Sequence, residues 1–218
     1  NGEVLDEASD FNHLFSEERV NKIDEKIKFY GTDDNTLRGL IFCSKVEECK
    51  AISEALNKIG YKTRALSGDD SEEERANAIN DIESDDPDKK IDYIITVNIF
   101  NEGIDIPRLN QVIMIRPTQS AIIFVQQLGR GLRKAERKEY LTVIDFIGNY
   151  QNNYLIPIAL YGDTSYNKDT IRKLMASGSS LIPGSSTINF DKISKSRIFE
   201  SIDSSNLKLR KDLVNDYQ

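Results

Sequence analysis

The segment QQLGRGLR, at residues 126–133, has the residue types and spacing to act on a phosphoryl group. Gln126, Arg130 and Arg133 are separated by four and three residues, so on a helix they share one face. Guanidinium groups stabilise the negative charge that develops on a phosphoryl group during transfer. The spacing therefore predicts a contact with a triphosphate. A solvated helix face is the ordinary alternative.

Two glycines, Gly129 and Gly131, stand beside these arginines. Each costs a helix interior roughly 1 kcal/mol relative to alanine, so their presence favours a role in backbone shape or close approach. They can also break the helix, and the shared-face argument then holds strictly only up to Gly129. The position of the segment after a strand-end loop, together with its glycines, favours a contact with a triphosphate over an ordinary solvated helix face.

No G-x-x-x-x-G-K-[ST] segment occurs in the chain, so it has no phosphate-binding loop of its own. The arginines are therefore expected to act on a nucleotide that is held elsewhere. The only histidine, His13, lies in a polar segment, and Cys43 and Cys49 are interpreted as buried, reduced thiols. No second Cys or His pair completes a zinc site, so we predict no metal site.

The composition is typical of a globular protein, with 39% hydrophobic and 30% charged residues among 218. A net charge of −7 argues against a generally basic nucleic-acid coat, although the basic residues between 130 and 138 leave room for a local groove. No apolar run approaches the roughly 20 residues of a membrane span, and no secretory signal is visible. We expect a cytoplasmic protein without a membrane contact. Because Asn1 is not a methionine, we also expect a fragment of a longer protein.

Short apolar segments that alternate with helical patterns predict an open α/β fold with a parallel sheet flanked by helices. The five expected strands are Leu37–Cys43, Tyr61–Leu66, Ile91–Thr96, Gln111–Arg116 and Tyr140–Asp145.

Helix signals frame these strands. Ser16 opens a helix that runs to about Tyr30, before a linker or loop at 31–36. Capping boxes are expected at Ser44 with Glu47 and at Ser71 with Glu74. Beyond Gly148 the pattern predicts a mainly helical extension, with helices at 149–161, 167–176, 192–202 and 206–217 and a short strand at Thr187–Phe190. The expected divisions are 1–35 (segment and linking helix), 36–150 (α/β domain) and 151–218 (extension).

Ligands of open α/β sheets bind outside the carboxyl ends of the strands. The loops expected there contain Ser44 after the first strand and Gly68 after the second. After the third strand, Gly103 would allow a ligand to approach closely, and Asp105 is an acceptor suited to a ribose hydroxyl. An ordinary cap and ordinary turns are the alternative interpretation of each.

Three segments, in this order, resemble the second RecA-like domain of superfamily 2 helicases and translocases of the DEAD/DEAH type. LIFCSK at 40–45 is similar to motif IV, TVNIFNEGIDIP at 96–107 to motif V, and QQLGRGLR to motif VI. The resemblance covers residues 36–150 and is closer to the branch with excision-repair and restriction translocases than to the DEAD-box RNA helicases. Residues 178–218 are similar to a region that follows the helicase core in some large bacterial multidomain helicases.

The resemblance implies a role for each segment. Arg130 and Arg133 would be arginine fingers for the γ-phosphate, with Gln126 beside the phosphates or the attacking water. Gly103 and Asp105 would contact ATP. The residues implied to line the nucleic-acid track are Ser44, Lys45, Ser67, Gly68, Thr96 and Asn98.

The resemblance also implies partners. ATP and Mg²⁺ would be held mainly by an absent first RecA-like domain, joined in cis. The expected polymer is a nucleic acid, DNA in preference to RNA. The isolated chain should be inactive as an ATP hydrolase. A non-catalytic interaction module with a helicase-like fold remains the main alternative, and a self-contained nucleotide-binding enzyme, such as a nucleotide-sugar transferase, is a second.

Overall fold

The structure is a computed structural model that describes residues 17–32, 35–97, 106–116, 135, 138–146, 154–163, 165, 167–177 and 189–204. The chain divides into two compact units. The described residues up to Arg116, and those from 135 to Phe146, belong to the first unit. Those from Tyr154 onward belong to the second.

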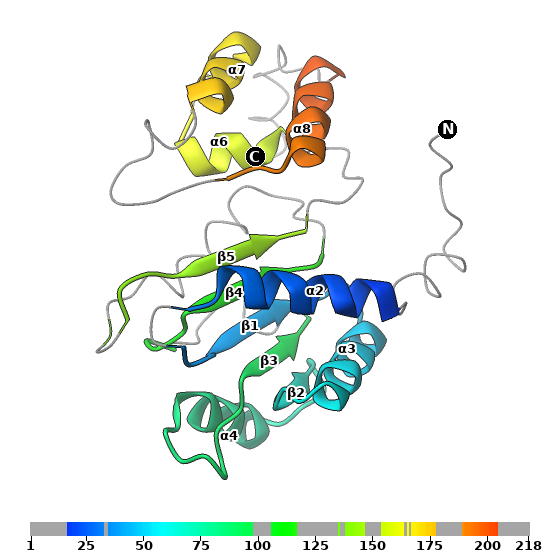
Figure 1. Ribbon diagram of the computed structural model, residues 1–218, viewed down its shortest axis with the longest axis vertical. Helices are drawn as coiled ribbons and strands as arrows, with labels where there is room; N and C mark the ends of the chain where they lie inside the picture. The colour runs from blue at the N-terminus through cyan, green and yellow to red at the C-terminus, as the bar shows by residue number, and fades with distance from the viewer. Residues whose placement is uncertain are drawn as a thin grey trace, which may run out of the picture. The chain divides into compact units, whose positions relative to one another are not determined.

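The first unit is built on a sheet of five parallel strands in the order β2-β3-β1-β4-β5 (Figure 1). Because all strands run the same way, their carboxyl ends meet at one edge of the sheet. The predicted open parallel sheet is confirmed. The strands are β1 (Gly39–Phe42), β2 (Thr63–Leu66), β3 (Tyr93–Thr96), β4 (Gln111–Met114) and β5 (Thr142–Asp145).

The strands are shorter than predicted, and the amino edge of the sheet shows why. Side-chain acceptors there bind backbone N–H groups that would otherwise extend the ladder. The Arg38 N–H donates to Asn110 Oδ1 at 3.0 Å, and the Lys62 N–H donates to Asp92 Oδ2 at 2.9 Å. The ladders of β1 and β2 therefore begin at Gly39 and Thr63, two residues later than expected.

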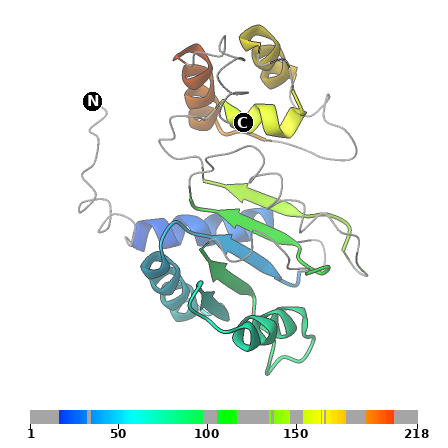
Figure 2. The same cartoon turned by 180° about the vertical axis from the view of Figure 1, so that it is seen from behind.

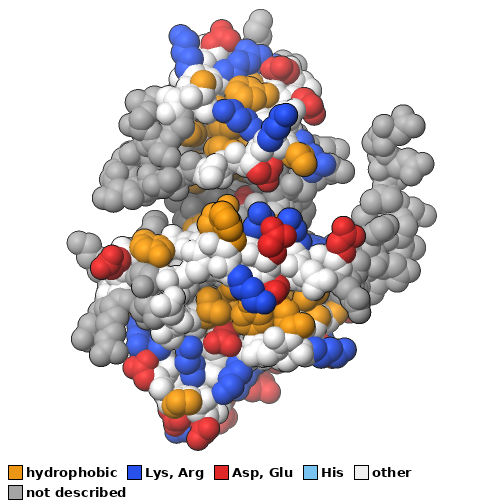
Figure 3. All heavy atoms as spheres, viewed as in Figure 1, with side chains coloured by type: hydrophobic (Ala, Val, Ile, Leu, Met, Phe, Trp, Pro, Cys, Tyr) orange, Lys and Arg blue, Asp and Glu red, His pale blue; other side chains and the backbone are white. Residues whose placement is uncertain are grey.

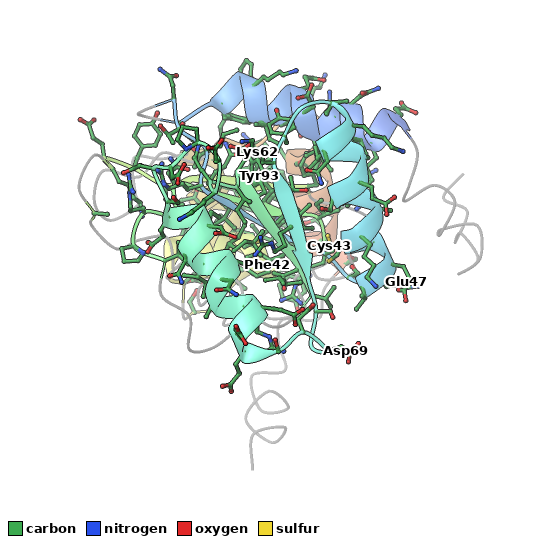
Figure 4. All side chains as sticks on the ribbon, turned by 90° about the horizontal axis from the view of Figure 1, so that it is seen from below. Phe42, Cys43, Glu47, Lys62, Asp69 and Tyr93 are labelled. Carbon is green, nitrogen blue, oxygen red and sulfur yellow. The ribbon has the colours of Figure 1, made fainter. Side chains whose placement is uncertain are left out.

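Helices cover both faces of the sheet. Helices α2 (Glu17–Tyr30) and α3 (Val46–Lys58) share one hydrophobic cluster with strand side chains such as Ile41 and Ile95. Helix α4 (Glu72–Glu83) buries Ala78 and Ile82. Figure 4 shows α3 and α4 on opposite sides of the sheet.

Helix α2 confirms the helix expected from about Ser16 to Tyr30. It ends at Gly31, whose φ of 57° is a left-handed conformation that glycine adopts without strain. Two hydrogen bonds attach it to the sheet region. The Tyr61 hydroxyl donates to Asp24 Oδ1 at 2.8 Å, and Gln111 Nε2 donates to the Gly31 carbonyl at 3.3 Å. The helix is therefore an integral part of the first unit.

One predicted capping box is confirmed and the other is wrong. Ser71 caps α4, with Glu74 closing the reciprocal hydrogen bond. The residue at the N-cap of α3 is Lys45, which makes no side-chain cap. The Ser44 N–H instead donates to the carboxylate of Glu48, one residue beyond the expected Glu47.

The second unit is helical, as predicted for the extension. Figure 2 shows its helices from behind: α6 (Leu155–Tyr161), α7 (Lys168–Ser177) and α8 (Lys192–Ser204). The predicted strand at Thr187–Phe190 is wrong where the structure describes it, because Asn189 and Phe190 form no strand and Phe190 packs on the helical core. The predicted helix at 206–217 lies outside the described residues. The core comes from all three helices: Ile158, Ile171, Met175, Ile198 and Ile202.

The face of the first unit that α2 covers carries both charged and hydrophobic side chains (Figure 3). Lysines, arginines and acidic residues are interspersed on the face that α2 covers (Figure 3). Among the helices that the structure describes, none has the length and apolar content to cross a membrane.

Candidate functional site

The carboxyl edge of the sheet brings together several residues that the sequence singled out. The last residues of the strands lie in register and so share one face. Cys43 and Asp69 lie toward this edge in Figure 4, whereas Lys62 lies at the opposite end of the sheet. The row across the sheet is Leu66, Thr96, Phe42, Met114 and Asp145.

The loop between β1 and α3 places Ser44 and Lys45 at the surface. The backbone N–H of Ser44 donates to Glu48 Oε2 at 2.8 Å, and the Ser44 hydroxyl makes no hydrogen bond to any residue that the structure describes. The amino end of α3 also lacks a side-chain cap. This loop therefore offers a hydroxyl, an ammonium and a helix amino end, all of which suit an anion such as a phosphate.

The loop between β2 and α4 is held by its own hydrogen bonds. Asp70 Oδ2 accepts from the Ser67 N–H at 2.5 Å and from the Ser67 hydroxyl at 3.1 Å. Arg75 Nη2 donates to the Gly68 carbonyl at 2.8 Å. Ser67 is buried and Gly68 is exposed. Of the two predicted track residues, only Gly68 therefore presents much surface to a ligand.

Acidic residues flank both loops. Glu47 lies in the first turn of α3, and Asp69 precedes the acidic first turn of α4, which contains Glu72 and Glu73. These carboxylates interact favourably with the macrodipoles of the two helices, but they repel an approaching phosphate. This part of the edge therefore has no excess of positive charge. An anionic polymer would bind here through individual hydrogen-bond donors.

Two residues in the last row of the sheet have side-chain oxygens that are buried without a hydrogen-bond partner among the described residues. They are Thr96, through Oγ1, and Asp145, through both carboxylate oxygens. Burial raises the pKa of Asp145 to about 7, because a carboxylate in an apolar setting is costly to ionise. Thr96 was singled out from the sequence, and its predicted ligand contact stays a prediction. Asp145 was not, although an acid at the end of an apolar strand was a visible signal.

Arg116 is a second residue of this edge that sequence reasoning missed. It follows β4, and its Cζ lies 5.7 Å from the centroid of the Phe42 ring. Burial lowers the pKa of its guanidinium. A charged residue two positions after the end of a buried parallel strand was the available signal.

The residues expected to act on the nucleotide lie outside the described residues, as does one residue of the predicted track. The geometry therefore bears on the loops after β1 and β2 and on the ends of β3, β4 and β5. The predicted residues outside the described part are Asn98, Gly103, Asp105, Gln126, Arg130 and Arg133.

The cysteines are buried free thiols, as predicted. The hydrogen bond with Cys49, together with burial, raises the pKa of Cys43 well above its usual range, which makes it an unreactive thiol. Among the described residues, no group of three His, Cys, Asp or Glu side chains is arranged to hold a metal ion.

Comparison with known families gives a match to the helicase conserved C-terminal domain over residues 18–135. The matched range includes nearly all of α2, the helices α3 and α4, and the strands β1 to β4.

Individual proteins are also similar to the chain. The Saccharomyces cerevisiae protein IRC3 is 24% identical over 184 residues, which is 80% of this chain and 26% of IRC3. The DEAD-box ATP-dependent RNA helicase rde-12 of Caenorhabditis elegans is 29% identical over 131 residues, or 58% of this chain and 13% of rde-12. The chain thus spans about a quarter or less of the length of these relatives.

The fold has a counterpart among solved structures. The E. coli DEAD-box protein SrmB superposes with a TM-score of 0.53 at 18% identity, covering 67% of this chain and 79% of the SrmB chain. At this level of identity the likeness concerns the fold alone.

Proposed function

From the premise that this chain belongs to the helicase conserved C-terminal domain family, we propose that it is the second motor domain of an ATP-dependent nucleic-acid helicase or translocase. The predicted superfamily 2 membership and the RecA-like fold class are confirmed. The observation that carries the proposal is the extent of the match, because residues 18–135 include four of the five strands and the whole of QQLGRGLR.

ATP is the proposed nucleotide. The relative rde-12 is named an ATP-dependent helicase, which supports this assignment. Because the chain has no phosphate-binding loop of its own, a first RecA-like domain joined in cis would hold most of the ATP and its Mg²⁺. The involvement of Mg²⁺ stays a prediction.

Arg130 and Arg133 are the proposed arginine fingers, and Gln126 the residue beside the phosphates or the attacking water. Their types and their spacing support these roles. Closure of the two motor domains would bring the guanidinium groups to the γ-phosphate. Gly103 and Asp105 would contact the nucleotide from the loop after β3.

The nucleic-acid track would run along the loops at the carboxyl edge. The exposed Ser44 and Lys45 support this assignment best, because the Ser44 hydroxyl has no partner among the described residues. Gly68 would offer its backbone. Such contacts with the phosphate backbone hold a strand without reading its sequence.

The bound polymer could be DNA or RNA. Named relatives include an RNA helicase, so the preference for DNA that the sequence suggested has no support from them. We propose a single-stranded nucleic acid as the ligand and keep DNA as a prediction, to be tested by comparing the two polymers in one assay.

The test is ATP hydrolysis by the longer protein that contains both motor domains, measured with and without single-stranded nucleic acid. A motor predicts hydrolysis that the polymer stimulates. Absence of hydrolysis in the presence of both polymers would instead indicate the non-catalytic interaction module. The isolated chain should hydrolyse no ATP, and turnover by this chain alone would mean that the phosphate site has been assigned to the wrong domain.

A further inference from the structure

Glu48, in the first turn of α3, is a charged residue that is only 1% exposed. Its two carboxylate oxygens have partners on different parts of the fold. Oε2 accepts from the Ser44 N–H at 2.8 Å, and Oε1 lies 3.1 Å from Arg19 Nη2 on α2, within an ion pair. The side chain thus connects the loop after β1 to the neighbouring helix.

The hydrogen bond to Ser44 differs from an ordinary capping box. In a capping box, the third residue of the helix returns to the N–H of the N-cap residue. The N-cap residue here is Lys45, but Glu48 reaches one residue further back. It therefore holds the loop that precedes the helix.

The ion pair makes the burial of this carboxylate tolerable. A buried charge without a partner is strongly unfavourable, so Glu48 depends on a cation. Arg19 supplies it from α2, and hydrogen bonds at Asp24 and Gly31 attach that helix to the rest of the unit. The counterion thus comes from a helix whose position is fixed by hydrogen bonds.

We propose that Glu48 is a positioning residue for nucleic-acid binding and that Arg19 is its counterion. The proposal rests on the proposed function, in which Ser44 and Lys45 contact the phosphate backbone. By holding the Ser44 N–H, Glu48 fixes the loop and leaves the Ser44 hydroxyl for the strand. By neutralising the carboxylate, Arg19 prevents it from repelling a phosphate bound at the loop.

These two roles predict how variants of Arg19 and Glu48 change nucleic-acid binding. Arg19→Ala leaves a buried, uncompensated carboxylate beneath the loop and weakens nucleic-acid binding. Adding Glu48→Gln to Arg19→Ala restores part of the binding, because the amide oxygen still accepts from the Ser44 N–H but carries no charge. Glu48→Ala removes the acceptor and weakens binding by loosening the loop.

The experiment uses the longer protein with both motor domains. Binding of a labelled oligo(dT) and of a matched oligo(U) is followed by fluorescence anisotropy, and stimulated ATP hydrolysis gives kcat and the oligonucleotide concentration at half-maximal rate. Arg64→Ala is the matched control, because Arg64 pairs with Asp81 at 2.7 Å between β2 and α4, away from the Ser44 loop. Thermal melting shows which variants are folded.

Arg19→Ala removes the counterion of Glu48, and Glu48→Ala removes the acceptor of the Ser44 N–H. Each is expected to raise the half-maximal oligonucleotide concentration about tenfold, with little change in kcat at saturation. Arg64→Ala should leave that concentration unchanged. Should Glu48→Ala fail to fold, Arg19→Ala and its combination with Glu48→Gln still decide the matter.

The proposal is overturned if folded Arg19→Ala and Glu48→Ala proteins bind both oligonucleotides like Arg64→Ala, or if Glu48→Gln restores nothing to Arg19→Ala. Failure of the proposed function has a different signature. Wild-type protein that binds an oligonucleotide without hydrolysing ATP would contradict the motor assignment, while the anisotropy series would still test the role of Glu48.

Discussion

Among the described residues, Asp145 is an unusual acid at the carboxyl edge of the sheet. Both its carboxylate oxygens are buried without a hydrogen bond to the described residues, and burial raises its pKa to about 7. A carboxyl group whose pKa is raised on folding binds its proton more tightly in the folded state. Its contribution to stability is therefore neutral at acidic pH and becomes increasingly unfavourable as the pH rises from about 4 to 7.

Asp145→Asn should remove this pH dependence. Between pH 5 and 7, the free energy of unfolding of the wild type should fall relative to the variant by roughly 1.4 kcal/mol per pH unit, because one proton is released on unfolding. Urea unfolding of both proteins across this range gives the difference directly. A difference that does not vary with pH would mean that Asp145 is ionised in the fold at pH 5.

Gly39 is a second residue whose identity is determined by packing. A Cβ atom at this position would lie 2.2 Å from Tyr93 Cε1. The Tyr93 ring is fully buried, and its hydroxyl donates a hydrogen bond to Gln111 Oε1, so the ring has no simple way to move aside. The first residue of β1 is therefore restricted to glycine by a neighbouring strand.

Gly39→Ala is expected to destabilise the protein by about 1 to 3 kcal/mol through overpacking. Gly68→Ala is the matched control, because a Cβ there meets no atom within 4 Å and the backbone is not left-handed. It should change the free energy of unfolding by less than about 0.5 kcal/mol. Equal midpoints of denaturation for the two variants would contradict the packing argument.

At the scale of elements, the two helices that follow β1 and β2 begin in different ways. Both are preceded by a serine with a glutamate three residues later, and the sequence predicts the same capping box for both. Only α4 forms it. At α3, Glu48 competes successfully because Arg19 stabilises its charge, and that cation comes from a separate helix. Local pattern cannot reveal a partner supplied by the tertiary fold.

Ser71→Ala should therefore destabilise the protein by about 1 kcal/mol, since it removes the hydroxyl that accepts from the Glu74 N–H at 3.2 Å. Ser44→Ala should have little effect on stability, because the Ser44 hydroxyl caps no backbone group of the described residues. The measurement is the free energy of unfolding at one pH. Comparable losses in both variants would show that Ser44 does act as a cap.

The strands illustrate what the sequence could predict about elements. Their approximate positions in the chain, their number and their parallel arrangement followed from alternating apolar and helical segments. Their amino ends did not, because Asn110 and Asp92 bind the backbone of Arg38 and Lys62. These acceptors come from neighbouring loops, and hydrophobic periodicity carries no information about them.

At the scale of the whole molecule, the sequence predicted the family of the domain more readily than the side-chain details at the carboxyl edge of its sheet. The order of LIFCSK, TVNIFNEGIDIP and QQLGRGLR indicated the family that the match over residues 18–135 confirms. It also predicted Ser44 and Lys45 as surface residues of one loop. It did not predict the buried Glu48 or Asp145, because burial of an acid depends on what the fold packs around it.

We propose that Arg130 and Arg133 act on ATP that another domain holds. The most direct test is the turnover of ATP at saturating ATP and nucleic acid in the longer protein, with Arg133→Ala compared with Arg137→Ala, an arginine outside QQLGRGLR. An arginine finger predicts that Arg133→Ala lowers kcat by roughly 10³ to 10⁵, while Arg137→Ala stays near the wild type. Wild-type turnover in Arg133→Ala would contradict the claim.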